Sequence, residues 1–268
     1  MRGGLVYMSE LKQREPEVTG VIAATRGNHG QSIAFAAGRS GLRAVIVVPH
    51  GNSPEKNAAV RALGAELVVH GNDFQDALEY AADLAEKEKL HFVDSFAEPL
   101  VRGVASYALE LFDAVSPLAA VYVPIGMGSG ACAVIAARNA LGLSTEVMGV
   151  CAAGAPAFAL SFKAKQRITT ESVNTMADGM ACRAPDPRAL EVMLSGLARI
   201  VTVTDPEITA AMRYLFTDTH NAAEGAGAAP LAALLQEQRE MQGRRVALIQ
   251  TGGNIDSDLF AATLASPT

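Results

Sequence analysis

Several features that mark other classes of protein are scarce in this sequence. Tryptophan is absent, aromatic residues make up 5% of the chain and charged residues 19%. No basic run is longer than a pair of residues, so a nucleic-acid-binding surface is not expected. No apolar run is long enough to span a membrane, and the N-terminus has no apolar signal core. We therefore expect a cytoplasmic protein that binds neither nucleic acids nor membranes.

Cysteine and histidine are also sparse. The three cysteines, Cys132, Cys151 and Cys182, are odd in number and far apart in the chain. That usage fits a reducing compartment better than a disulfide framework. The histidines at positions 50, 70, 91 and 220 lack the spacing of metal ligands, so no metal site is predicted from them.

What the sequence does contain is glycine, with 24 residues, and short apolar runs that alternate with helical patterns. A strand–helix pattern occurs three times between residues 20 and 95, and a second such series follows. This alternation predicts an α/β fold with parallel sheets covered by helices. Residues 154–198 are expected to be irregular apart from a helix at 186–197. Expected strands are 21–24, 44–49, 66–70, 90–94, 119–124, 146–151, 199–203 and 245–250.

Three glycine-containing loops each follow an expected buried strand, at residues 25–30, 126–130 and 251–254. Ligands bind at the carboxyl ends of parallel strands, so the three loops are expected to converge on one site. The middle loop runs into a helix, whose N-terminus and backbone N–H groups attract anions. This loop therefore predicts a phosphate site.

Two other interpretations of the middle loop are open. Residues 126–131 also match the dinucleotide-binding pattern G-x-G-x-x-A, which requires an acid at the end of the next strand. That strand ends in Cys151-Ala-Ala, without an acid. Alternatively, the glycines only allow a helix to pack tightly on a strand.

Several motifs follow one another along the whole chain: Met1-Arg2-Gly3-Gly4, residues 25–31, Pro54 with Lys56, residues 123–130, Ala177-Asp178-Gly179, residues 224–228 and residues 251–254. Their order resembles that of fold-type II pyridoxal-phosphate (PLP) enzymes, specifically the serine/threonine dehydratases (threonine ammonia-lyases). The resemblance implies two three-layer αβα domains with mainly parallel sheets, as in the tryptophan synthase β-subunit. It assigns residues 18–98 to a small domain, assigns residues 1–17 and 99–268 to a large PLP-binding domain, and implies a homodimer.

By resemblance, Asn28 would bind the phenolic oxygen of the cofactor ring. Thr251, where the family usually has serine, would bind the pyridine nitrogen, and Glu224 would lie near the cofactor pocket. The cofactor phosphate would rest on the loop Gly126, Met127, Gly128, Ser129 and Gly130, and the substrate would be lined by Thr25, Arg26, Gly27 and His29. Asp178 belongs to a motif near which some relatives bind a divalent cation, but it equally suits a turn cap.

The chain departs from the family pattern at two positions. The family's Schiff-base lysine lies two residues before the arginine that matches Arg2, so it would fall immediately before Met1. Lys56 belongs to a helix motif that it is expected to stabilise, and the other lysines lie in polar contexts. Arg26 replaces a serine that serves racemases as a base, a role that a permanently protonated arginine cannot fill. We therefore expect a truncated chain, inactive as given, and doubt racemase activity.

The implied reaction of the longer parent is β-elimination from L-threonine, L-serine or a related 3-hydroxy amino acid, giving a 2-keto acid and ammonia. A β-replacement synthase of the same fold is one alternative. A non-catalytic remnant that binds PLP or phosphate is the other.

Overall fold

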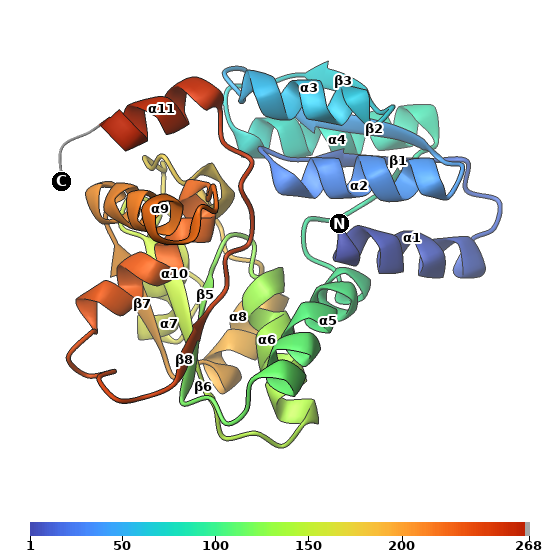
Figure 1. The fold of residues 1–268 in the computed structure, drawn as a ribbon. Helices are drawn as coiled ribbons and strands as arrows, with labels where there is room; N and C mark the ends of the chain where they lie inside the picture. Colours follow the sequence, from blue (N-terminus) through green and yellow to red (C-terminus); the bar gives the residue numbers. More distant parts are fainter. Residues whose placement is uncertain (266–268) are drawn as a thin grey trace. The chain divides into compact units, whose positions relative to one another are not determined.

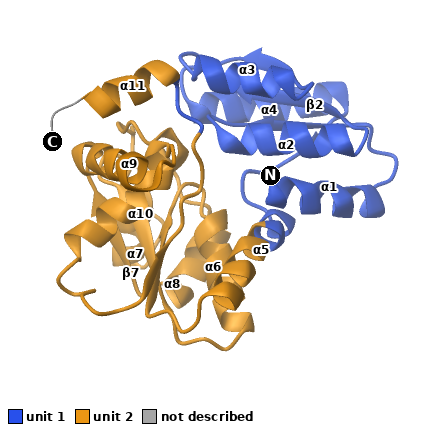
Figure 2. Ribbon diagram, in the orientation of Figure 1, with its two compact units in different colours: residues 1–103, 254–256 blue, residues 104–253, 257–268 orange. Residues whose placement is uncertain are grey.

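The structure, a computed structural model, describes residues 1–265, which fall into two compact units (Figures 1 and 2). Unit 1 comprises residues 1–103 and 254–256, and unit 2 comprises residues 104–253 and those from 257 onward. Each unit contains a four-stranded sheet in which all strand pairs are parallel. The predicted α/β fold with parallel sheets is confirmed.

Unit 1 is a sheet of order β3-β2-β1-β4 covered on both faces. Val21 and Ala23 of β1 pack in the core beneath α1 and α2, while Ile22 and Ala24 pack against α4. A strand buried on both faces must be apolar throughout, which explains the uninterrupted run in β1. The elements are α1 (Arg2–Arg14), β1 (Gly20–Ala24), α2 (Asn28–Arg39), β2 (Arg43–Val48), α3 (Pro54–Ala62), β3 (Glu66–Val69), α4 (Phe74–Glu88) and β4 (His91–Phe92).

Helix α1 lies in unit 1 because its apolar side packs on α2. Tyr7, Met8 and Leu11 of α1 are buried in the same core cluster as Ile33 of α2. Gly4 makes a close approach, since a Cβ there would lie 2.7 Å from the backbone oxygen of Ser32. Residues 1–17 therefore belong to unit 1, whereas the family resemblance assigns them to the large domain.

Unit 2 repeats the arrangement with the order β7-β6-β5-β8. Val123 of β5 faces α6, and Tyr122 faces α10, which α9 covers in turn. Helix α5 (Glu98–Ala114) spans the boundary at Gly103. The other elements are β5 (Ala120–Pro124), α6 (Ser129–Ala140), β6 (Glu146–Ala152), α7 (Ala157–Ala164), the 3-10 turn η1 (Asp178–Met180), α8 (Pro187–Gly196), β7 (Arg199–Val203), α9 (Asp205–Thr219), α10 (Gly225–Gln236), β8 (Val246–Leu248) and α11 (Ser257–Ala265).

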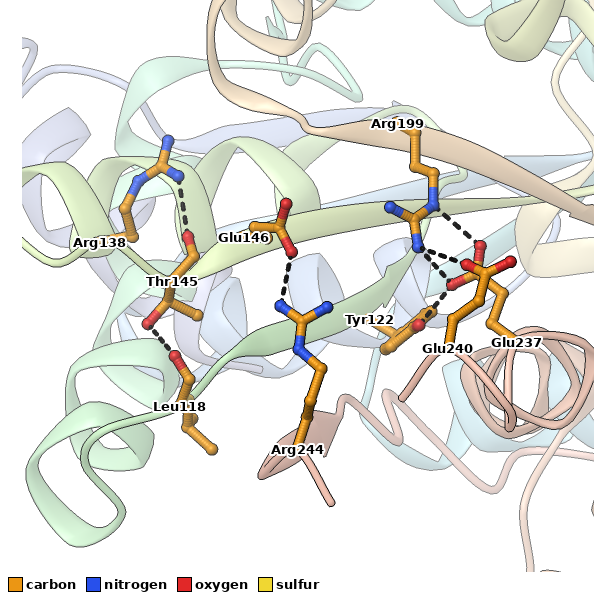
Figure 3. A network of polar contacts seen from close by, with 9 residues as sticks. All are labelled: Leu118, Tyr122, Arg138, Thr145, Glu146, Arg199, Glu237, Glu240 and Arg244. Carbon is orange, nitrogen blue, oxygen red and sulfur yellow. Dashed lines mark hydrogen bonds and ion pairs between the residues drawn. The ribbon is translucent and has the colours of Figure 1, made fainter. Parts of the chain in front are cut away.

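A polar network ties the end of α10 to the sheet of unit 2 (Figure 3). Both carboxylate oxygens of Glu237 accept bonds from Arg199, each 2.8 Å long, and one also accepts the hydroxyl of buried Tyr122. Burial opposes ionisation of Glu237, but the bonds from Arg199 and Tyr122 outweigh it, so the pKa of this carboxyl is lowered. The network is thus an ionised, partly buried pair.

Three helices were not predicted from sequence: α1, α7 and α11. Helix α7 lies in the stretch expected to be irregular, and its sequence AFALSFKA shows no polar face. The three cysteines are free and buried, and burial raises the pKa of the Cys182 thiol to about 11, so it is protonated at neutral pH. Within residues 1–265, no helix has both the length and the apolar character needed to cross a membrane.

Candidate functional site

The two sheets share one strand order, and that order marks where ligands can bind. In each, the first strand of the unit lies between the second and the fourth, as β1 does between β2 and β4 and β5 between β6 and β8. The connections from β1 to β2 and from β3 to β4 therefore run to opposite sides of β1, and those from β5 to β6 and from β7 to β8 to opposite sides of β5. In open α/β sheets, ligands bind outside the carboxyl ends of the strands at such a switch point. The loops at residues 25–30 and 126–130 begin at these two points.

The loop after β5 is shaped by glycine. Gly128 precedes α6 with φ 102°, in the left-handed region that side chains rarely adopt. A Cβ there would lie 2.6 Å from Met193 Cε, and one at Gly126 would lie 2.2 Å from the backbone oxygen of Gly179. Both glycines are therefore required for packing. Gly130 is different, since a Cβ there would make only an ordinary 3.6 Å contact with the Tyr107 hydroxyl.

The A-D-G motif packs against this loop, and the start of α10 packs against the A-D-G motif. Gly179 lies in η1, and a Cβ at Gly225, the first residue of α10, would lie 3.0 Å from Ala177. The segment before η1 is fixed by Asp205, which accepts the Thr175 hydroxyl at 2.6 Å and the Met176 amide at 2.9 Å. The A-D-G motif is thus wedged between the glycine loop and the start of α10.

The loop after β8 lies beside the same helix start. The Glu224 amide donates to the Gly252 oxygen at 3.0 Å, and a Cβ at Gly227 would lie 2.5 Å from that oxygen. Glu224 is the N-cap of α10 and is 2% exposed, while Thr251 is exposed. Unit 2 therefore brings together the glycine loop, η1, Glu224 and the Thr251 loop, as the convergence of strand ends requires.

This arrangement fits a phosphate monoester. The first turn of α6 has backbone N–H groups without partners inside the helix, and its dipole favours an anion. Met127 and Ser129 are only half-buried, so the turn is accessible. Among the described residues, no group of three His, Cys, Asp or Glu side chains is placed to hold a metal ion, and Asp178 belongs to no such group.

The loop after β1 in unit 1 is held by a side chain instead. The buried Thr25 hydroxyl accepts from the Gly27 amide at 2.9 Å and from the Gly30 amide at 3.3 Å. A Cβ at Gly30 would lie 2.4 Å from Thr25 Cγ2, so glycine is needed there. Thr25 thus organises the loop from inside, and the following residues, Arg26 to His29, are the partly exposed ones.

Arg26 and His29 each have a buried side-chain nitrogen in this loop. Within residues 1–265, Nε of Arg26 and Nε2 of His29 are covered and have no hydrogen-bond partner. Desolvation lowers the pKa of His29 to about 4, the nearby N-terminal ammonium acts in the same direction, and Asp94 opposes it. His29 is therefore neutral at physiological pH, and Arg26 is the charged side chain of the loop.

Asn28 begins α2 and is bound by a residue far away in the sequence. Asn254 Nδ2 donates to Asn28 Oδ1 at 2.5 Å and to Gln31 Oε1 at 3.2 Å. Sequence reasoning recognised Asn254 only as the end of a motif and gave no role to Gln31. No signal in a single sequence links these positions, which are more than 220 residues apart.

The lysines of the chain are placed differently from one another. Lys56 is 6% exposed, and its Nζ lies 3.6 Å from the position of a Cβ on Gly27, so it packs beneath the loop after β1. This goes beyond the predicted role in stabilising its own helix. Lys12 is half-buried beside Pro16, with Nζ 3.5 Å from the Pro16 oxygen, and the others are exposed: Lys87, Lys89, Lys163 and Lys165.

The start of α1 lies beside the same loop. The Met1 oxygen accepts the Ser32 hydroxyl at 3.4 Å, and the Met1 ammonium is close enough to His29 to lower the pKa of that ring. The backbone just before Arg2 therefore reaches the first turn of α2.

Comparisons with known proteins agree with this geometry. The L-threonine ammonia-lyase of Thermotoga maritima is 32% identical over 261 residues, covering 97% of this chain and 65% of that protein. The biosynthetic L-threonine dehydratase of Escherichia coli is 32% identical over 259 residues, covering 96% of this chain and 50% of that protein. The chain thus spans about half to two thirds of the length of these curated relatives.

Solved structures show the same fold. The processed form of threonine deaminase isoform 2 from Solanum lycopersicum superposes with a TM-score of 0.91 at 30% identity, over 99% of this chain and 79% of that one. A pyridoxal 5'-phosphate-dependent aspartate racemase gives a TM-score of 0.91 at 26% identity, over 96% and 80%. A model of the family described as pyridoxal-phosphate dependent enzyme matches residues 1–252. The chain therefore belongs to the pyridoxal-phosphate dependent enzymes, with the fold-type II architecture.

Proposed function

We propose that the whole protein is a PLP-dependent ammonia-lyase that acts on L-threonine, L-serine or a related 3-hydroxy amino acid. The observation that carries this proposal is the cluster of four motifs at the carboxyl edge of the unit 2 sheet, with the glycine loop at the N-terminus of α6. The similarity to proteins named threonine ammonia-lyase supports the choice of reaction. A small amino acid is thus the proposed substrate.

The residues of unit 2 would hold the cofactor. The backbone of the loop Gly126–Gly130 suits its phosphate, the exposed Thr251 hydroxyl suits the pyridine nitrogen, and Glu224 lies beside the Thr251 loop. PLP supplies an electron sink for the bond broken at the substrate α-carbon. A neutral hydroxyl leaves the ring nitrogen unprotonated, which weakens that sink and suits a reaction whose leaving group departs at once.

The residues of unit 1 would recognise the substrate and the ring oxygen. Asn28 offers a carboxamide for the ring oxygen, and the loop Thr25–His29 lines the substrate. Arg26 carries the positive charge of this loop and can bind a carboxylate through two parallel hydrogen bonds, but it cannot accept a proton. We therefore propose that Arg26 binds substrate and excludes racemisation.

We propose that no lysine within the chain serves as the Schiff-base residue. Lys56 is committed to packing beneath Gly27, and the remaining lysines are exposed or lie at the end of α1. By resemblance the residue in that role directly precedes Met1, whose backbone lies beside His29 and the first turn of α2. The chain without that lysine is then expected to bind PLP without turnover.

The test is a form with a lysine joined directly before Met1, compared with a matched form that has alanine there. The lysine form with PLP should release 2-keto acid from L-threonine or L-serine, and borohydride should label the added lysine. The alanine form should do neither. PLP binding without 2-keto acid from either form would favour the non-catalytic alternative, and product formed only when sulfide traps the intermediate would favour β-replacement.

We further propose a cytoplasmic homodimer. The buried, unpaired cysteines suit a reducing compartment, and the dimer follows from the family resemblance alone. Light scattering on the purified protein gives the mass directly, and a monomer at micromolar concentration would contradict the dimer.

A further inference from the structure

A three-residue segment at the end of the Thr251 loop belongs to unit 1 and is bound to it by its first and last residues. Residues 254–256 cluster with unit 1, although the chain on both sides belongs to unit 2. Asn254 donates to Asn28 and Gln31 at the start of α2. Asp256 accepts the Ser53 hydroxyl at 2.5 Å and the Glu55 amide at 3.4 Å, at the start of α3. We call residues 254–256 the strap.

The bonds of Asn254 fix which end of each carboxamide faces it. An amide NH₂ group donates two hydrogen bonds and accepts none. Because Nδ2 of Asn254 faces both partners, Asn28 and Gln31 must both turn their oxygens toward it. The nitrogen Nδ2 of Asn28 is thereby the end of its amide that is turned away from Asn254.

Gln31 shows that this arrangement has a cost. Its side chain is 6% exposed, and within residues 1–265 its Nε2 has no hydrogen-bond partner. A buried donor without a partner costs about 1–3 kcal/mol. Turning the Gln31 amide over would put its Nε2 against the NH₂ of Asn254, so the strap holds Gln31 in this orientation as it does Asn28.

We propose that Asn254 is a positioning residue, which holds the Asn28 carboxamide with Nδ2 as the donor to the cofactor ring oxygen, and that Asp256 anchors it. This inference rests on the proposed function of Asn28. A ring oxygen that carries negative charge needs a donor opposite it, and a carboxamide turned the other way presents a repelling oxygen. Asn254 removes that second orientation.

The test compares two substitutions that delete the same bonds. Asn254→Ala removes the donor that faces Asn28 Oδ1 and puts no acceptor in its place. Asn254→Asp removes the donor and supplies an acceptor, which pulls Nδ2 of Asn28 toward itself and turns Oδ1 outward. We expect the PLP dissociation constant to rise a few-fold for Asn254→Ala and more than ten-fold for Asn254→Asp. If the strap only stabilised the fold, Asn254→Ala and Asn254→Asp variants with the same melting temperature would have the same PLP dissociation constant.

A double-mutant cycle gives a second readout. In an Asn28→Ala background, the two Asn254 variants should have equal PLP affinity, because the amide on which they act is gone. Inorganic phosphate should bind all forms equally, since its proposed site is the glycine loop of unit 2, which none of these substitutions alters. The matched control is Asn52→Asp, because Asn52 Nδ2 donates to Asn57 Oδ1 at 2.7 Å in the same unit. This control should leave PLP affinity unchanged.

The measurement is PLP titration followed by absorbance, on the 268-residue chain and on the form with lysine before Met1, with melting curves of each apo form. If Asn28→Ala leaves PLP affinity unchanged, the proposed role of Asn28 fails, and the positioning role fails with it. If Asn28→Ala weakens binding but the Asn254 variants match the unsubstituted chain, or act equally in both backgrounds, only the positioning role is overturned.

Discussion

The loops that follow β1 and β5 occupy equivalent places in two sheets of identical strand order, yet they are held by different means. In unit 1 the buried Thr25 hydroxyl accepts two backbone amides, and the residues after it, 26–29, are partly exposed. In unit 2, Gly126 and Gly128 press against η1 and α8, which leaves mainly backbone to face a ligand. Where a buried side chain holds the loop, the outward-facing residues can vary without disturbing it. Where close packing of glycines holds the loop, backbone N–H groups are what it presents to a ligand.

The main ion pairs of the two units differ in how far their carboxylates are exposed. Arg43 of unit 1 pairs with Glu66, which is 55% exposed. Arg199 of unit 2 makes the same two-bond contact with Glu237, which is 13% exposed and also accepts the Tyr122 hydroxyl. Exposed pairs contribute little to stability, and loss of one partner costs more where the pair is covered.

The largest expected effect lies in the glycine loop of unit 2. Gly128→Ala forces a left-handed residue against Met193 and Ala189, so we expect a loss of about 2–4 kcal/mol of unfolding free energy. PLP and phosphate affinity should fall together. Gly130→Ala is the matched control and should cost under about 1 kcal/mol, because a methyl group fits there. Equal urea midpoints for the two variants would show that the loop is not held by glycine packing.

The partly buried ion pair of Arg199 and Glu237 gives the next effect. At pH 7, Glu237→Gln should lower the unfolding free energy by about 1–3 kcal/mol, and Glu66→Gln by less than about 1 kcal/mol. The pKa of Glu237 is lowered in the folded state relative to its ordinary value of 4.5. The contribution of its charge is therefore present above that value and lost as the pH falls through the lower folded pKa. Urea unfolding at pH 7 measures the destabilisation by each substitution, and urea unfolding below pH 4 tests its dependence on pH. If Glu237→Gln lowered the unfolding free energy equally at both pH values, the predicted role of the Glu237 charge would be contradicted.

His29 should make the loop of unit 1 sensitive to acid. Its pKa is lowered to about 4 in the folded protein from 6.5, so the unfolded chain binds this proton first as the pH falls. The contribution of neutral His29 to the unfolding free energy is thus fully present above pH 6.5 and is lost as the pH falls from 6.5 to 4. Relative to His29→Gln, which cannot titrate, the unsubstituted chain should lose on the order of 1–2 kcal/mol between pH 7 and 5. Parallel stability curves for the two proteins would rule this out.

The smallest expected effect concerns recognition by Arg26 and needs the form with lysine before Met1. Arg26→Ser removes the two-bond contact to a carboxylate, so the KM for L-threonine, L-serine or 3-hydroxyaspartate should rise by about ten-fold at most, with stability unchanged. If Arg26 selects a second carboxylate, 3-hydroxyaspartate should be affected most, and some D-isomer should appear. Unchanged kinetics for all three substrates would make Arg26 a surface residue.

The sequence by itself determined the order of the strands and of most helices, and the place of the three loops. Runs such as Val21–Ala24 and Ala119–Pro124 are apolar because both faces of a parallel strand are buried, and that signal is local. Caps are local too, and Pro54, Phe74 and Asp205 begin helices where Ser53, Asp73 and Thr204 precede them. The motif order also carried the resemblance to PLP enzymes, which the family match confirms.

Only the tertiary structure decided which of these residues meet. Helix α1 escaped prediction because Gly3 and Gly4 disfavour a helix locally, and its packing on α2 overrides that preference. Gly126 and Gly128 of the loop after β5 proved to be required by contacts with the Gly179 oxygen and Met193, which lie more than fifty residues away in the chain. The bond from Asn254 to Asn28 is of the same kind, because hydrogen bonds between distant side chains leave no periodic trace in a single sequence.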